Sequence, residues 1–121
     1  MALNAAGYTA SGAGAAATNG DYRPATGANA TVNGVTQFTN GTYFLAYNPS
    51  GQHGPVPEWG VYQGPYTGQA ALYFCTAGAS ASNVPSTGWN AQNGAIPAPT
   101  WTAIIAAAPA PPRNLTTVVV Y

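Results

Sequence analysis

The sequence predicts a mainly β fold: a small antiparallel β-sandwich or barrel with an extended N-terminal arm and long loops. Three observations favour it. Runs of β-branched and aromatic residues are short, turn residues separate them, and the runs recur about every 8–12 residues. No segment carries the apolar stripe and caps of a helix of ordinary length. With 121 residues, the chain has the length of one domain.

Residues 1–30 are expected to form the extended arm, and residues 31–121 the β domain. The arm is composed mainly of Ala, Gly, Thr, Ser and Asn, and after Met1 its large apolar side chains are Leu3, Tyr8 and Tyr22. Glycines interrupt each possible helical turn, and so few large side chains cannot order a segment by themselves. We therefore expect the rest of the domain or a neighbouring subunit to hold the arm.

Six runs of strand-forming residues follow the arm. They are 31–36, 42–47, 60–62, 70–76, 101–106 and 116–121. We expect the first to be a tight hairpin, because Asn33-Gly34 readily takes the positive φ angles of a type I′ turn. A short helix is the alternative for 101–106. The longer segments between the runs are rich in Gly, Pro, Ser and Asn, which predicts loops.

The C-terminal part of the chain combines a proline-rich segment with an apolar run. Pro109, Pro111 and Pro112 predict an extended, polyproline-like connector. The run 116–121 is β-prone, and an unpaired apolar edge attracts other chains. We therefore expect this run to pair inside the fold or across a subunit interface.

Charged side chains are almost absent from the chain. Lys and Arg number 2, Asp and Glu number 2, and only 3% of the residues are charged. A typical domain has about 25%. A protein that neutralises phosphates needs a basic face, so binding to nucleic acid or to anionic membranes is not expected. An acid–base active site also needs more titratable groups. We expect a non-enzymatic protein without cofactor or metal, whose zero net charge favours self-association.

Targeting signals are absent from the sequence as given. Residues 1–7 have neither the charged region nor the apolar region of a signal peptide. No stretch approaches the roughly 20 apolar residues of a membrane-spanning helix. Cys75 is the single cysteine, so no internal disulfide is expected. These features predict synthesis in a cytoplasm and no membrane partner.

The ionisable side chains considered as site candidates are His53, Cys75, Asp21, Glu58 and Arg23. His53 has no cluster of further ligands near it in sequence, which favours a loop histidine over a metal ligand. Cys75 lies in a predicted strand and is expected to be a buried thiol. Asp21 and Glu58 are expected to be solvated surface charges; paired glycosidase carboxylates are the alternative. Asp21 and Arg23 are close enough to pair locally.

Aromatic residues are the most informative candidates for a binding site. Trp59, Tyr62 and Tyr66 cluster in a loop-rich segment, and Trp89 lies in a loop of Gly, Asn and Ser. Flat aromatic faces with neutral amides beside them suit sugar rings. The alternative, which we favour, is that these four residues anchor the core or an interface.

Residues 70–90 join a strand-like run to small polar residues, a proline and a tryptophan. The segment reads Tyr73-Phe74-Cys75-Thr76-Ala77-Gly78, followed by Ser80-Ala81-Ser82, Pro85 and Trp89. Together with the uncharged composition, it resembles the accessory virion proteins of tailed bacteriophages, namely head decoration (cement) proteins and short fibre modules. This resemblance implies non-enzymatic assembly, often as a trimer on the capsid surface, with the arm or a terminal strand contacting neighbours.

These observations lead to two hypotheses about function. The first is a virion structural protein: a capsid decoration protein, made in the host cytoplasm, that forms a homo-oligomer, with a trimer favoured. Its partner would be the major capsid protein or another virion protein. The alternative is a fibre module that binds a carbohydrate or a host receptor through the aromatic set.

Overall fold

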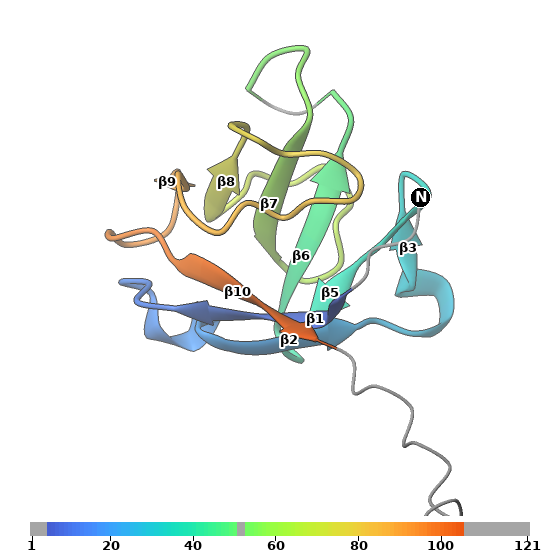
Figure 1. Ribbon diagram of the computed structural model, residues 1–121, viewed down its shortest axis with the longest axis horizontal. Coiled ribbons are helices and arrows are strands. Elements are labelled where there is room, and N and C mark those ends of the chain that lie inside the picture. The colour runs from blue at the N-terminus through green and yellow to red at the C-terminus, as the bar shows by residue number, and fades with distance from the viewer. Residues whose placement is uncertain (1–4, 51–52, 106–121) are drawn as a thin grey trace, which may run out of the picture.

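The computed structural model describes residues 5–50 and 53–105. It is an antiparallel sheet of eight strands in the order β10-β1-β2-β5-β6-β7-β8-β9, with a separate β3–β4 hairpin. The sheet curls, so that β10, β1 and β2 cross beneath β6, β7 and β8 (Figure 1). The prediction of a small, mainly β, antiparallel fold of the sandwich or barrel class is therefore confirmed.

The elements are short and are listed here in chain order. They are β1 (Ala5–Ser11), the 3-10 helix η1 (Ala16–Thr18), β2 (Gly20–Pro24), the 3-10 helix η2 (Gly27–Asn29), β3 (Thr31–Val32), β4 (Val35–Thr36), β5 (Phe38–Thr39), β6 (Tyr43–Asn48), β7 (Glu58–Gln63), β8 (Tyr73–Cys75), β9 (Asn90–Ala91) and β10 (Thr100–Ile105).

Five of the six predicted strand runs fall in the described residues, and all five contain strands. The first is the hairpin β3–β4, in which Asn33 and Gly34 have φ angles of 55° and 77°, as the type I′ turn requires. The run 101–106 is a strand and not a helix through Ile105. The run 116–121 and the predicted connector at Pro109–Pro112 lie outside the described residues.

The prediction of an N-terminal arm is wrong for residues 5–30. Strand β1 lies inside the sheet, paired antiparallel with β10 on one side and with β2 on the other. Tyr8 and Tyr22 are opposite each other in the β1–β2 register, and both are buried. Gly7 has no room for a Cβ beside the Tyr22 carbonyl. The small residues that resemble a low-complexity linker therefore let three strands pack closely.

The main core fills the concave side of the curled sheet and is rich in aromatic rings. Tyr8 packs edge-on against Phe38 at 5.2 Å between ring centroids, and Phe38 continues to Trp59 at 6.4 Å. Trp101 contacts Tyr22 at 5.1 Å. Large rings supply the buried area that this alanine-rich chain could not gain from aliphatic side chains. They also join the two halves of the sheet.

A second, smaller cluster covers the other face of β6 and β7. Ala46 and Tyr62 are fully buried there, and Ala71 from the segment before β8 covers them. Gly60 and Tyr62 lie on the same face of β7, and the Tyr62 ring folds directly over the Gly60 backbone. Both faces of β6 and β7 are therefore covered, which makes this strand pair the centre of the domain.

Candidate functional site

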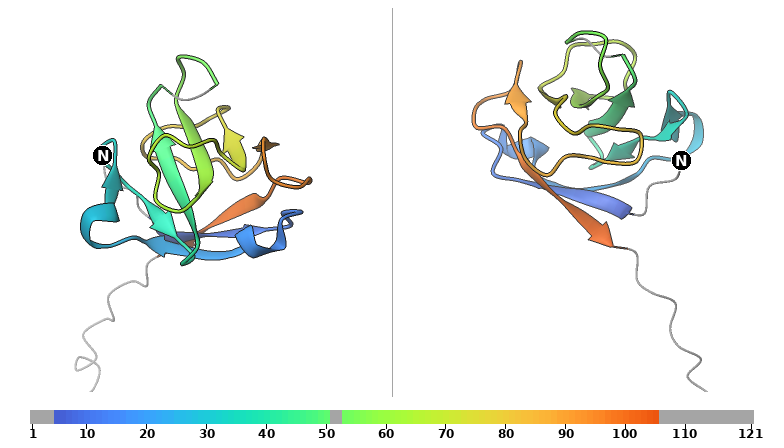
Figure 2. Two further views of the ribbon diagram at one scale, coloured as in Figure 1. Left: turned by 180° about the vertical axis from the view of Figure 1, so that it is seen from behind. Right: turned by 45° about the horizontal axis from the view of Figure 1, so that its top comes forward.

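A long segment, 76–89, crosses the open side of the curled sheet between β8 and β9 (Figure 1 and the right panel of Figure 2). Indole groups and backbone hydrogen bonds hold it there. Trp59 Nε1 donates to the Ser80 carbonyl at 2.8 Å, and the backbone N–H of Trp101 donates to the Ser86 carbonyl at 2.9 Å. The segment thereby bridges β7 and β10, and it leaves a hollow between itself and β1.

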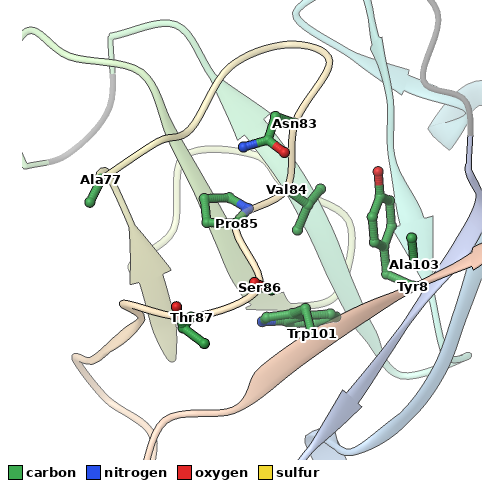
Figure 3. A pocket seen from close by; sticks show the side chains of 9 residues that line it. All are labelled: Tyr8, Ala77, Asn83, Val84, Pro85, Ser86, Thr87, Trp101 and Ala103. Atoms are coloured by element: carbon green, nitrogen blue, oxygen red, sulfur yellow. The ribbon is translucent and has the colours of Figure 1, made fainter.

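That hollow is a pocket of about 450 Å³. Side chains of β1 and β10 and of the segment 77–87 line it, as Figure 3 shows. The lining residues are Tyr8, Ala77, Asn83, Val84, Pro85, Ser86, Thr87, Trp101 and Ala103. None of them is charged, and a volume of this size is within the usual range of ligand pockets.

Trp101 stands out in this pocket because its polar atom has no partner. The residue is only 3% exposed, and its ring packs against Tyr22 and against Trp89, 5.2 Å away between centroids. Its Nε1 is buried and makes no hydrogen bond. By contrast, the indole N–H groups of Trp59 and Trp89 donate to the carbonyls of Ser80 and Pro85.

An unpaired buried donor is uncommon, and it costs about 1–3 kcal/mol relative to a paired one. In Figure 3 the nitrogen-bearing edge of Trp101 lies on the Thr87 side of the pocket, while Tyr8 stands at the opposite side. Burial raises the pKa of Tyr8, so its phenol is neutral at ordinary pH. The pocket therefore suits an uncharged ligand that carries both polar and apolar groups, because hydroxyl and amide side chains line it together with aromatic and aliphatic ones.

The four aromatic residues proposed from the sequence do not form a shared surface. Trp59 and Tyr62 are fully buried on opposite faces of β7, and Trp89 is buried behind Trp101. Tyr66 is partly exposed and packs on Tyr62 with ring centroids 4.4 Å apart. A sugar-binding platform made of these four side chains is therefore ruled out, and three of them serve the core.

The expectation for Glu58 is also wrong. Its side chain is fully buried, and Oε1 lies 3.0 Å from Nδ1 of His53. The His53 ring stacks on Phe74, with centroids 3.5 Å apart and planes at 4°. Oε2 of Glu58 is buried without a hydrogen-bond partner. Glu58 is the first residue of β7 and not part of the preceding loop, and its side chain is buried there.

A polar chain continues beside this pair. Nδ2 of Asn48 donates to the Tyr62 hydroxyl at 3.0 Å, and Nδ2 of Asn33 donates to Oδ1 of Asn48 at 3.0 Å. Burial, and next the carboxylate of Glu58, raises the pKa of Tyr62 well above its usual range, and the Asn48 hydrogen bond opposes this rise. The group is connected from the β3–β4 turn to β7, and its members bond mainly to one another.

The remaining titratable candidates, Cys75 and Asp21, lie where the sequence predicts them. Cys75 is buried, as predicted, and burial raises the pKa of its thiol. Asp21 and Arg23 form an exposed ion pair at 3.7 Å, so Asp21 is a surface charge, as predicted. Among the described residues, no group of three or more potential metal ligands exists. No helix within 5–50 or 53–105 is long and apolar enough to cross a membrane.

Comparisons with protein-family models, with curated proteins and with solved structures find no match to this chain. Its class is therefore defined by its own geometry: a partly open antiparallel β-barrel with an aromatic core and a neutral pocket. Sequence reasoning missed this pocket, because Tyr8 and Trp101 are far apart in the chain. The one available signal was the period-two pattern of Trp101 and Ala103 in a predicted strand.

Proposed function

We propose that this protein is a non-enzymatic structural component of a virion, a capsid decoration protein that self-associates and binds the capsid lattice. The observation that carries the proposal is the edge of the sheet at β10. This six-residue strand pairs with β1 alone among the described strands and contains neither charge nor proline. At its end Ile105 is 75% exposed.

Natural proteins protect such an edge with charged residues, prolines or bulges, because unpaired strand backbone pairs readily with other chains. Within residues 5–50 and 53–105, only the first part of the β10 edge is covered, by the hydrogen bond from the Trp101 N–H to the Ser86 carbonyl. Among the described residues with Asp, Glu, Lys or Arg side chains, Asp21 and Arg23 are exposed and form an ion pair, and Glu58 is buried. Electrostatic repulsion between copies is accordingly weak.

In this proposal the contacts of the decoration protein are neutral and mainly backbone and apolar in kind. Copies would associate along β10, with a trimer as the favoured assembly, and the assembly would bind the major capsid protein or another virion protein. Binding to the assembled shell stabilises it by mass action. The chain would be made in the host cytoplasm and would act in the virion.

The first test is the mass of the pure protein in solution, measured by light scattering over a hundredfold range of concentration. We expect an oligomer that resists salt, because few charges are involved. Ile105→Lys should shift the protein toward monomer, whereas Val56→Lys, in an exposed loop away from β10, should not. A wild-type monomer at every concentration would overturn the self-association.

The second test concerns the virion. A density gradient of the lysate in which the protein is produced naturally should contain it in the band of assembled particles, at a copy number that matches the symmetry of the shell. Recovery of the protein only among the small soluble proteins would contradict the decoration role. In that case a result from the first test would support self-association only, and not a role in the virion.

The alternative function, a fibre module that binds a carbohydrate or a host receptor, is favoured by one observation: the neutral pocket that contains Trp101. Its site differs from the aromatic set proposed from the sequence. A glycan array would test it with wild-type protein and with Trp101→Phe. Binding that this substitution weakens would support the alternative, and an array without signal would remove it.

A further inference from the structure

We propose that two copies of this chain pair the free ends of their β10 strands antiparallel, about a twofold axis that passes between their Ile104 residues. The proposal rests on the self-association described above and gives that contact a register. It is drawn from three observations: the direction of the backbone groups at the end of β10, the exposed side chain of Ile105, and the neutrality of the edge.

The first observation concerns the backbone groups of β10. The Trp101 N–H donates to the Ser86 carbonyl, so it points away from β1. Residues of an antiparallel strand direct their N–H and C=O groups to alternate sides, and Ala103 and Ile105 therefore also face away from β1. Among the described residues, no backbone hydrogen bond reaches these two on that side. In the right panel of Figure 2 this end of β10 extends beyond the segment 76–89.

These outward groups restrict how a second β10 strand can pair. Ser86 already occupies the position beside Trp101, so only the last three residues of the strand are free. A twofold axis at Ile104 places Ala103 of each copy opposite Ile105 of the other. Each such pair exchanges two hydrogen bonds, and every outward group of the free end is then satisfied. With Ala103 opposite itself, Ile105 would meet the occupied position beside Trp101.

The second observation is the side chain of Ile105, which is 75% exposed. Residues directly opposite each other in an antiparallel pair lie on the same face of the sheet and contact each other. Ile105 of one copy would therefore pack on Ala103 of the other. Ala103 is itself exposed and stands with Tyr8 at one side of the pocket (Figure 3). Its small side chain leaves room for the larger isoleucine.

The third observation is the absence of charge, which favours a second copy as the occupant of this edge. Neither β10 nor the lining of the adjacent pocket contains a charged residue. A twofold contact brings each surface against its own copy, and an uncharged surface does not repel itself. Three residue pairs bury little surface, so we expect a weak dimer, with a Kd in the micromolar to millimolar range. A trimer would need a further contact surface.

A cysteine at position 104 tests the register. In the proposed contact the two Ile104 residues are opposite each other without mutual hydrogen bonds, which places their Cα atoms about 4.5 Å apart, within reach of a disulfide. The full chain with Ile104→Cys, treated with oxidised glutathione, should form a covalent dimer on a non-reducing gel. Cys75 is buried and is present in every variant, so the wild-type protein gives the background.

Two further cysteine variants separate pairing from random collision. Thr102→Cys lies in the same strand and on the same face as Ile104, but in this register position 102 does not meet its own copy. Val56→Cys is in an exposed loop. We expect Ile104→Cys to form the covalent dimer about tenfold faster than either, because pairing raises the local concentration of its thiol.

Proline substitutions test the outward N–H groups without any added cysteine. Ala103→Pro removes an N–H that faces away from β1, and proline is tolerated on an edge strand in that orientation. Each copy loses one hydrogen bond of the dimer, so association measured by sedimentation should weaken about tenfold. Thr102→Pro is the matched control: its N–H faces β1, and thermal unfolding should show a larger loss of stability than for Ala103→Pro.

The outcomes distinguish this contact from self-association in general. Faster crosslinking at position 104, together with weaker association of Ala103→Pro, would support the twofold pairing. Equal crosslinking of all three cysteine variants, or equal destabilisation by both prolines, would overturn it. If the wild type forms oligomers but Ile104→Cys crosslinks no faster than the controls, the register is wrong while self-association stands. A wild type that is monomeric at every concentration would overturn both proposals.

Discussion

The imidazole ring of His53 lies parallel to the phenyl ring of Phe74, with 3.5 Å between the ring centroids. Phe74 thereby fixes the plane of an imidazole whose Nδ1 meets the buried carboxylate of Glu58 at 3.0 Å. The loop before β7 is thus tied to β8 and to β7 at once. A buried charge with one partner is sensitive to the loss of that partner.

We expect His53→Ala to lower the free energy of unfolding by about 3 kcal/mol, because it leaves the Glu58 carboxylate buried and unpaired. Urea denaturation measures this change. In a Glu58→Gln background, where no buried charge remains, His53→Ala should cost at least 1 kcal/mol less, a coupling of ordinary size for residues in contact. Strictly additive effects would show that the pair does not interact in solution.

Gly60→Ala should destabilise the protein by about 1–3 kcal/mol, the usual cost of inserting a methyl group into a packed site. The added Cβ would collide with the ring and hydroxyl of Tyr62, which lie directly over Gly60. The same substitution should be nearly neutral in a Tyr62→Val background, because the ring is then absent. An equal cost in both backgrounds would contradict the proposed collision.

Replacing each of two tryptophans by phenylalanine should have unequal effects on stability. Trp59→Phe leaves the Ser80 carbonyl without its donor, whereas Trp101→Phe removes a donor that has no partner. The volume lost is the same, so the difference reflects the hydrogen bonds. We expect Trp101→Phe to be less destabilising by about 1–3 kcal/mol in thermal or urea unfolding. Equal losses would indicate that the Trp101 N–H has found a partner.

Stability should fall steeply as the pH rises above about 10, the ordinary pKa of tyrosine. Burial raises the pKa values of Tyr8, Tyr22 and Tyr62 in the folded protein. The unfolded chain therefore releases these three protons first, so unfolding is favoured as pH rises and the stabilisation is complete below pH 10. The slope approaches about 4 kcal/mol per pH unit if all three contribute.

Urea midpoints between pH 8 and pH 11 measure this alkaline effect. Tyr62→Phe removes one of the three protons and should reduce the slope by about a third. Absorbance at the tyrosinate band reports the ionisation independently. A urea midpoint that does not change up to pH 11 would show that the three tyrosines have the same pKa values in the folded and unfolded protein.

The strand content of the middle of the chain was predictable, because its signals are local. Asn33-Gly34 specifies its turn by backbone conformation alone, and β6, β7 and β10 have the β-branched and aromatic composition of strands. The role of residues 5–11 was not predictable in this way. Their small side chains have low strand propensity, and the pairing with β10, some 90 residues later in the chain, determines their conformation.

Of the candidate site, the sequence predicts only that its lining is uncharged, because the chain has so few charged residues. The pocket joins Tyr8 to Trp101, and no pattern within a short window shows that these residues meet. The aromatic set from the sequence failed for a related reason: Trp59 and Tyr62 are three residues apart in a strand, and they therefore point to opposite faces. The sequence predicts a surface position for Glu58, because its partner His53 comes close only when the loop between β6 and β7 is folded.

The pairing of Ala5 with Ile105 in adjacent antiparallel strands has a mechanical consequence. The first and last of the described residues, Ala5 and Ile105, therefore lie side by side. A force that pulls these two positions apart would load the β1–β10 pairs one after another, as a zipper opens, and would not shear them together. Tension through both ends would therefore separate β10 easily, whereas a load applied through the β6–β7 pair would meet the whole sheet.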